Sequence, residues 1–445
     1  MARVGLVSLG CPKNTVDAEE ILGEIARAGH EIETDPALAE VLIVNTCGFI
    51  QSAKEESIEA ILEAVGRKTS SLCRSVLVTG CLAQRYGSEL AKELPEVDAV
   101  IGLGKVDEIL QAVNATIAGE KVLDVGDPGP WWLKSRGRLL STAPWTAYLR
   151  VADGCDNRCS YCSIPDIRGG FASRPERNIL EEATALAEMG VRELNLVAQD
   201  VTRYGLDMTG ELRLHLLLDK LSEIEGIHWI RLLYCYPTRV SDDLIRVIAE
   251  NPKVCPYLDV PLQHVSEHIL RAMGRAGDKD AYRALFDKIR NACPKAALRT
   301  TFIVGFPGET EADIEELTDF VSEVRFDRLG VFKYSREEGT PASKLTGLPS
   351  KSAANARFRR LMKVQQGISL ETNRALIGSR IEVLIEKING DIAVGRSYRD
   401  APEIDGIVRI TNCGNLQPGC FISAQVTGAE HYDLLAKTEV TSDEL

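Results

Sequence analysis

The chain lacks any apolar run approaching the roughly 18 residues that a membrane span requires. Its start, Met1–Gly5, leads directly into an apolar strand pattern, so we expect no secretory signal. Without a secretory route, the 12 cysteines are expected to be thiols and ligands in a reducing cytoplasm rather than disulfides. The glycines of residues 101–105 are too few for a dinucleotide-binding fingerprint.

Positive charge is scarce at both ends of the chain. Residues 1–130 carry 11 basic and 21 acidic side chains, and residues 367–445 carry 7 and 12. Both regions should therefore repel polyanions and attract a basic partner.

Histidine is also scarce where a metal site would need it. Cys155, Cys159 and Cys162 are separated by three and then two residues, so one short loop can bring three thiolates together. Thiolates suit an iron–sulfur cluster or zinc, but a closed zinc site needs a fourth nearby ligand, and the next histidine is His215. The spacing favours a cubane cluster with one open iron that can chelate a small molecule. A structural zinc loop is the alternative.

Three more cysteines share a position relative to predicted strands. Each of Cys11, Cys47 and Cys81 follows the end of an apolar segment, and helical patterns separate the segments. The segments are Val4–Leu9, Val41–Thr46 and Ser75–Gly80. This alternation predicts a parallel α/β sheet, whose strand ends meet at one ligand-binding edge. The three thiols could converge there, or they could be ordinary core cysteines.

Residues 126–142, rich in Pro, Gly and Trp, predict a linker. Beyond it, six predicted strands alternate with helices. The strands are Thr146–Val151, Glu193–Ala198, Trp229–Tyr234, Tyr257–Val260, Arg299–Val304 and Arg328–Phe332. The helices are Pro175–Met189, Glu211–Ile224, Asp242–Ala249, Ala281–Ala292 and Glu311–Val324. Six units are too few for a closed eight-fold barrel and predict an open partial barrel.

Several groups follow these strands and should face the barrel mouth, as the cysteine loop does. They are Gln199, Asp200, Pro261, Gln263, His264 and the run Gly305-Phe306-Pro307-Gly308-Glu309. The glycines of that run can bring bare backbone to a ligand, although a plain strand–helix turn is the alternative. His264 is a weaker candidate for a catalytic base, because such histidines often only complete hydrogen bonds.

The last part of the chain begins with a basic helix over Ser350–Gln366, which we interpret as a solvated face, with RNA or ribosome contact as the lesser alternative. Short strands with polar turns then predict a small antiparallel β-barrel. They are Arg380–Glu386, Ile392–Arg396, Gly406–Ile410 and Ala424–Thr427.

The cysteine loop, with Tyr161 just before its last cysteine, resembles the signature of radical S-adenosylmethionine (SAM) enzymes. Over nearly its full length the chain resembles a methylthiotransferase. That family implies an N-terminal flavodoxin-like domain (1–126), a linker (127–142), a radical SAM core (143–366) and a TRAM barrel (367–445).

Within this family the closest resemblance is to RimO. It rests on Ser8–Asn14, where tRNA-modifying MiaB-type relatives typically carry Gly-Cys-Gln-Met-Asn, and on Val197–Asp200 and Gly395–Gly406. The acidic C-terminal segment supports this choice independently, because a barrel that holds tRNA should be basic.

The resemblance implies a [4Fe–4S] cluster on Cys155, Cys159 and Cys162, whose open iron binds SAM and whose electron releases a 5′-deoxyadenosyl radical. It also implies a second [4Fe–4S] cluster on Cys11, Cys47 and Cys81 that delivers the sulfur. SAM would be seated by Tyr161, Gln199, Gln263 and Gly305, Phe306, Pro307, Gly308 and Glu309.

The implied product is a methylthio group on the β-carbon of an aspartate in a small-subunit ribosomal protein, free or in the assembled subunit. The electron and sulfur donors stay unidentified. Three alternatives are open: the same chemistry on a tRNA adenosine, a non-catalytic iron–sulfur carrier or scaffold, and an RNA-binding module with zinc-stabilised domains.

Overall fold

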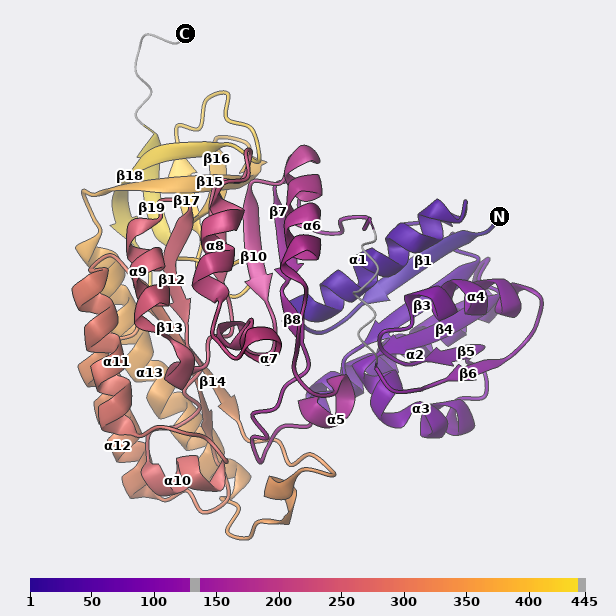
Figure 1. Ribbon diagram of the computed structural model, residues 1–445, viewed down its shortest axis with the longest axis horizontal. Coiled ribbons are helices and arrows are strands. Elements are labelled where there is room, and N and C mark those ends of the chain that lie inside the picture. The colour runs from indigo at the N-terminus through magenta and orange to yellow at the C-terminus, as the bar shows by residue number, and fades with distance from the viewer. Residues whose placement is uncertain (129–136, 439–445) are drawn as a thin grey trace.

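The computed structural model describes residues 1–128 and 137–438, which form three units (Figure 1). The first is a parallel sheet in the order β2-β1-β3-β4-β5-β6. Its strands are β1 (Arg3–Ser8), β2 (Glu31–Ile32), β3 (Val41–Thr46), β4 (Ser75–Gly80), β5 (Ala99–Ile101) and β6 (Val122–Asp124). Its helices are α1 (Pro12–Arg27), α2 (Gln51–Ser70), α3 (Cys81–Glu93) and α4 (Val106–Ile117).

This sheet is covered on both faces, which is why its strands read as continuous apolar runs. Ile21 and Ile25 of α1 pack with Ile109 of α4 on one face, and Ile61 of α2 packs with Leu90 of α3 on the other. The three predicted strands and the parallel α/β architecture are confirmed. The strands β2, β5 and β6 were not predicted, because two or three residues carry too little periodic signal.

The second unit is an open sheet of six parallel strands in the order β14-β13-β12-β11-β10-β7. The strands are β7 (Thr146–Arg150), β10 (Glu193–Val197), β11 (Trp229–Leu232), β12 (Val254–Asp259), β13 (Ala297–Val304) and β14 (Arg328–Lys333). The main outer helices are α6 (Glu176–Glu188), α8 (Leu214–Ser222), α9 (Asp242–Glu250), α11 (Lys279–Ala292) and α12 (Glu311–Val324). The predicted partial barrel and its six strands are confirmed.

Shorter elements were not predicted. They are the ribbon β8 (Ala152–Asp153) and β9 (Ala172–Ser173), the helices α5 (Ile164–Arg168), α7 (Leu206–Thr209) and α10 (Glu267–Ala272), and the 3-10 turns η2 (Val201–Arg203), η3 (Pro237–Arg239) and η4 (Pro341–Lys344). Residues 129–136 of the predicted linker, which include Trp131 and Trp132, lie outside the described residues. Its last part is tied to the first unit, since the Leu139 amide donates to the Glu19 carbonyl.

The helix α13 (Lys351–Ala375) extends past its predicted end at Gln366. Two of its basic side chains form ion pairs, whereas Lys351, Arg359 and Lys363 are exposed. Arg357 pairs with Glu309 at 2.7 Å, and Arg360 pairs with Glu311 at 2.8 Å. The exposed charges agree with the interpretation of this helix as a solvated face.

The third unit is a closed five-stranded barrel in the order β15-β16-β17-β19-β18. The strands are β15 (Arg380–Asn389), β16 (Ile392–Ser397), β17 (Val408–Thr411), β18 (Phe421–Ala429) and β19 (Leu434–Thr438). The predicted barrel is confirmed, with one correction: β17 and β19 pair in parallel, so the barrel is mixed rather than antiparallel. The cause is β19, an unpredicted fifth strand that closes the barrel beside β17.

The third unit covers the starting ends of the partial-barrel strands (Figure 1). Arg396 of β16 pairs with Glu193 at 2.6 Å, and Glu193 also binds Arg231 at 3.1 Å. The Tyr257 hydroxyl donates to Asp405 in the loop after β16 at 2.6 Å. The loop thus closes the end of the barrel opposite to the one where such folds place chemistry. Within the described ranges, no helix has the length and apolar character to cross a membrane.

Candidate functional site

The N-terminal cysteines lie where the first sheet reverses its strand order. Cys11 caps α1 after β1, Cys47 follows β3, and Cys81 begins α3 after β4. Because β2 lies on one side of β1 and β3 on the other, the crevice at the ends of β1 and β3 is the ligand-binding position of this topology.

Two glycines allow the cysteine loops to approach closely. A Cβ on Gly10, whose φ is +99°, would lie 2.9 Å from the Cys47 Cβ and 3.2 Å from its Sγ. A Cβ on Gly48 would lie 2.8 Å from the Leu82 backbone, directly after Cys81. Any larger residue at either position would push the cysteine loops apart.

The three thiols are close enough to influence one another's ionisation. Burial opposes ionisation of Cys11, but Lys13 and Arg168 hold the pKa of its thiol below the ordinary value. Burial raises the pKa of Cys81 to about 12, and the charges of Cys11 and Cys47 add to the rise. Iron binding there must displace a proton from Cys81, and the Arg168 guanidinium favours the thiolate.

The loop of Cys155, Cys159 and Cys162 is held by its backbone. The Cys155 amide donates to the Gly169 carbonyl at 3.1 Å, and the Ser160 amide donates to the Met273 carbonyl at 2.8 Å. Arg275 approaches the Cys159 sulfur at 3.7 Å. Burial raises the pKa of Cys162 to about 12, and the neighbouring Cys159 and Cys155 also raise it.

Within the described part of the chain, no three His, Cys, Asp or Glu side chains are arranged to hold a single metal ion. A single zinc ion needs all its ligands within about 2.0–2.3 Å of one point. A cubane cluster tolerates a wider arrangement, because each thiolate binds a different iron.

The other predicted site residues lie around the same loop. Tyr161 packs with Phe306, and the Gln199 amide donates to Asp153 at 2.7 Å. Gln263 has a φ of +73° and forms a backbone bridge to Phe302. In the run that begins at Gly305, Pro307 is buried and Gly308 is exposed.

His264, the weaker candidate for a catalytic base, and Glu309, a predicted SAM contact, are both held by internal partners. Glu309 accepts two hydrogen bonds from the Gly305 amide, at 2.8 and 3.0 Å, and pairs with Arg357. His264 is fully buried, and its Nδ1 accepts a hydrogen bond from the Ser266 amide at 3.0 Å. For His264, these contacts favour a structural role over that of a catalytic base.

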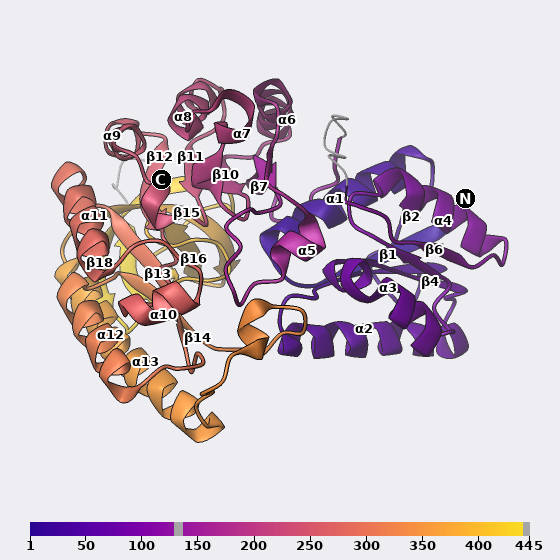
Figure 2. The same cartoon turned by 60° about the horizontal axis from the view of Figure 1, so that its bottom comes forward.

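The short helix α5 lies between the first unit and the partial barrel (Figure 2). It begins two residues after Cys162 and advances about 8 Å, at ~1.5 Å per residue. At its far end Ile167 packs on Cys81, and Arg168 donates to Asn14 Oδ1 at 2.7 Å. The Cys81 sulfur lies 3.6 Å from that same oxygen. One helix therefore contacts both sites.

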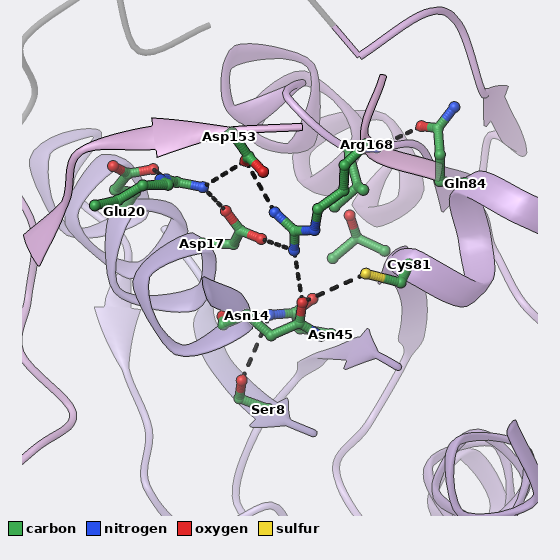
Figure 3. A network of polar contacts seen from close by, with 12 residues as sticks. Ser8, Asn14, Asp17, Glu20, Asn45, Cys81, Gln84, Asp153 and Arg168 are labelled. Atoms are coloured by element: carbon green, nitrogen blue, oxygen red, sulfur yellow. Dashed lines mark hydrogen bonds and ion pairs between the residues drawn. The ribbon is translucent and has the colours of Figure 1, made fainter. Parts of the chain in front are cut away.

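A buried ion network fixes this junction between the units (Figure 3). Arg168 pairs with Asp17 of α1 at 2.8 Å and with Asp153 at 3.0 Å. Arg150 pairs with Asp17 at 2.5 Å and Glu20 at 3.0 Å. Burial opposes ionisation of Asp153, but the two arginines hold its pKa below the ordinary value. Burial raises the pKa of Glu20 to about 7, even beside Arg150.

Sequence reasoning did not find this network. Its members are separated by up to 151 positions in the chain, as Arg168 and Asp17 are. No local pattern marks an isolated Asp on a helix as the partner of a distant Arg. The only available signal was the position of Arg168 shortly after the cysteine loop.

Three family models match the three units. Residues 149–321 match the radical SAM superfamily, residues 3–102 match the uncharacterized protein family UPF0004, and residues 377–438 match the TRAM domain. Two solved structures of the radical S-adenosylmethionine methyltransferase TsrM from Kitasatospora setae share the fold. One has a TM-score of 0.57 and 15% sequence identity, and the match covers 77% of each chain. The other has a TM-score of 0.58 and 12% sequence identity, and the match covers 83% of this chain and 89% of TsrM. Fold and cysteine loop together define a radical SAM enzyme.

Curated relatives show to which family of radical SAM enzymes the chain belongs. The ribosomal protein uS12 methylthiotransferase RimO of Desulforamulus reducens is 49% identical over 98% of this chain and 99% of its own length. That of Pelotomaculum thermopropionicum is 50% identical over 98% and 99%. The chain belongs to the RimO family of radical SAM methylthiotransferases, as its motifs predicted.

Proposed function

We propose that this enzyme adds a methylthio group to the β-carbon of an aspartate in ribosomal protein uS12, with two [4Fe–4S] clusters. The observation that carries the proposal is the junction at α5: two sets of three cysteines, on different units, lie at the two ends of one five-residue helix. A single radical reaction needs one such set. Two sets side by side support a reaction that must both activate a carbon and deliver sulfur to it.

Cys155, Cys159 and Cys162 would hold the SAM-binding cluster. The donor set fits, because three thiols lie on one backbone-ordered loop and Arg275 faces Cys159 with positive charge. When bound, cluster and SAM supply the one-electron chemistry that removes hydrogen from an unactivated carbon. The Gly305–Glu309 turn, Tyr161, Gln199 and Gln263 would line SAM, with the exposed Gly308 leaving room at the backbone.

Cys11, Cys47 and Cys81 would hold the second cluster. The set fits because Gly10 and Gly48 let the loops converge, and because Lys13 and Arg168 offset the thiolate charge. The ion network holds this set against the barrel, where its cluster would supply sulfur close to the other cysteine set. Free thiols throughout the chain agree with work in the reducing cytoplasm, where ribosomes are made.

The substrate follows from charge and from the relatives. The relatives' name specifies uS12, and ribosomal proteins are rich in Lys and Arg, which suits the acidic first and third units. Free uS12 and the assembled small subunit are both candidate forms. A tRNA adenosine is the second candidate, but the acidic third unit is a poor surface for phosphates.

The test is anaerobic reconstitution with iron, sulfide, SAM and a reductant, with small ribosomal subunits and unmodified tRNA offered in parallel. Mass spectrometry should find a methylthio group on one aspartate of uS12 and none on tRNA. A Cys155→Ala variant is the control and should release no 5′-deoxyadenosine. A methylthio group on a tRNA adenosine would refute uS12 as the substrate. SAM cleavage without a methylthio group on either substrate would favour a carrier or scaffold role for the second site.

A further inference from the structure

One buried cation differs from all the others in the described part of the chain. Nine Lys and Arg side chains are buried there, and eight of them form ion pairs with Asp or Glu. The eight paired residues are Arg138, Arg150, Arg168, Arg174, Arg231, Arg328, Arg396 and Arg399. Lys13 is the ninth, and across residues 1–128 and 137–438 it has neither an ion-pair partner nor a hydrogen-bond acceptor.

Lys13 lies between the two cysteine sites. It follows Cys11 by two residues in the first turn of α1, and its side chain is only 7% exposed. Its ammonium lies 3.7 Å from the ring centroid of Tyr234, which follows β11 at the barrel mouth. The Tyr234 amide is itself held by Asp259 at 3.0 Å. Lys13 thus extends from the first unit to the mouth of the partial barrel.

The aromatic ring does not satisfy the ammonium group. A cation over a ring is stabilised electrostatically, but its three N–H donors still need acceptors. Burying a charge without such a partner is costly, which is why the eight arginines are all paired. Apart from the Cys11 thiol, whose pKa it lowers, Lys13 meets no anionic partner among the described residues, and its unused N–H donors indicate an anionic group that arrives with a ligand.

We propose that Lys13 binds the side-chain carboxylate of the target aspartate. This inference rests on the function proposed above. The carboxylate is attached directly to the β-carbon, so an ammonium that fixes the carboxylate fixes the reacting carbon one bond away. A Lys–carboxylate contact is a charge-assisted hydrogen bond, stronger than a neutral one. Arg168 is not available for this role, since Asp17 and Asp153 already bind it.

The experiment uses the reconstituted holoenzyme and a peptide spanning the target loop of uS12, made with Asp or with Asn at the target position. The enzyme variants are Lys13→Met, which keeps the side-chain length without the charge, and Lys13→Arg, which keeps the charge. Peptide dissociation constants, turnover, the KM for SAM, iron and sulfide content, and 5′-deoxyadenosine release without peptide are measured for each.

The wild type should bind the Asp peptide more tightly than the Asn peptide. Lys13→Met should weaken binding of the Asp peptide about 10- to 100-fold, the range for losing a hydrogen bond to a charged group. It should leave the Asn peptide unaffected, so the preference disappears. Lys13→Arg should retain part of the preference. The KM for SAM and peptide-free SAM cleavage, which depend on the other cysteine set, should not change.

Three results would overturn the assignment. Equal loss for both peptides together with lower iron content would assign Lys13 to the charge of the second cluster. A raised KM for SAM would assign Lys13 to binding of the SAM carboxylate. An unchanged preference of Lys13→Met for the Asp peptide would show that Lys13 does not recognise the target carboxylate. Failure of the proposed function is seen separately, because the wild type would then place no methylthio group on the Asp peptide.

Discussion

Glu193 anchors the third unit to the partial barrel, and its replacement by Gln tests how firmly. The side chain is fully buried and lies between Arg231, at 3.1 Å, and Arg396, at 2.6 Å. The Thr146 hydroxyl donates to it at 2.9 Å. Gln has the same shape but no charge, so the variant leaves two buried guanidinium groups without their carboxylate.

The magnitude follows by two routes. Burial opposes ionisation of Glu193, but Arg396 and Arg231 lower its pKa from 4.5 to about 2. At about 1.4 kcal/mol per pKa unit, this difference corresponds to about 3 kcal/mol of stability at neutral pH. Breaking a buried ion pair by removing one partner costs about 3–5 kcal/mol, which agrees. We expect Glu193→Gln to lower the free energy of unfolding by about 3 kcal/mol.

The sign of the pH dependence is also fixed. A carboxyl whose folded pKa is depressed stabilises the fold above its unfolded pKa, near 4.5. The wild type should therefore lose this contribution as the pH falls from about 5 to about 2, and the variant should lack that part of the slope.

The assay is urea unfolding followed by tryptophan fluorescence, on the chain without added iron so that acid does not destroy clusters. Trp229 is a suitable reporter, because its ring packs edge-on against Phe421 of the third unit at 4.7 Å. Glu181→Gln is the matched control, because its pair with Arg177 is exposed and should contribute little. Equal stability of wild type and Glu193→Gln, or equal acid sensitivity, would refute the reasoning.

Three further variants test the site. Cys81→Ala should halve the iron content of the reconstituted enzyme and abolish methylthio transfer while SAM cleavage continues. The control is Cys73→Ala, at a buried cysteine two residues before β4, which should change neither the iron content nor methylthio transfer. Arg168→Gln breaks the contacts of α5 with Asp17 and Asp153, and because a misplacement of about 1 Å can cost about 100-fold in rate, transfer should fall about 100-fold while SAM cleavage falls much less. Equal loss of both activities would show that α5 does not couple the sites. The pKa of Glu20 is about 7 in the folded state and 4.5 in the unfolded state, so its contribution to stability is lost as the pH rises through 7. Glu20→Gln should therefore flatten the pH dependence of the unfolding free energy, measured by urea titration, between about pH 5 and 8. An unchanged slope would exclude a raised pKa.

The sequence by itself determined the class of the protein and the six strands of its partial barrel. Strands buried on both faces are continuous apolar runs, and this signal revealed all six strands of the partial barrel. The helices between those strands were found by their 3.6-residue period. The cysteine loop is a local motif whose spacing alone limits the chemistry. Both kinds of signal lie within a few residues along the chain.

Only the tertiary structure decided how the units meet. Five-residue α5 and three-residue β5 have too little periodicity to predict, and β19 changed an antiparallel barrel into a mixed one. The pairing of Glu193 with Arg396 spans 203 positions, and no sequence pattern specifies such a partner. Within residues 1–128 and 137–438, Lys13 is the one buried cation without a carboxylate partner, and this emerges only from the packed chain, because burial and pairing are properties of tertiary structure.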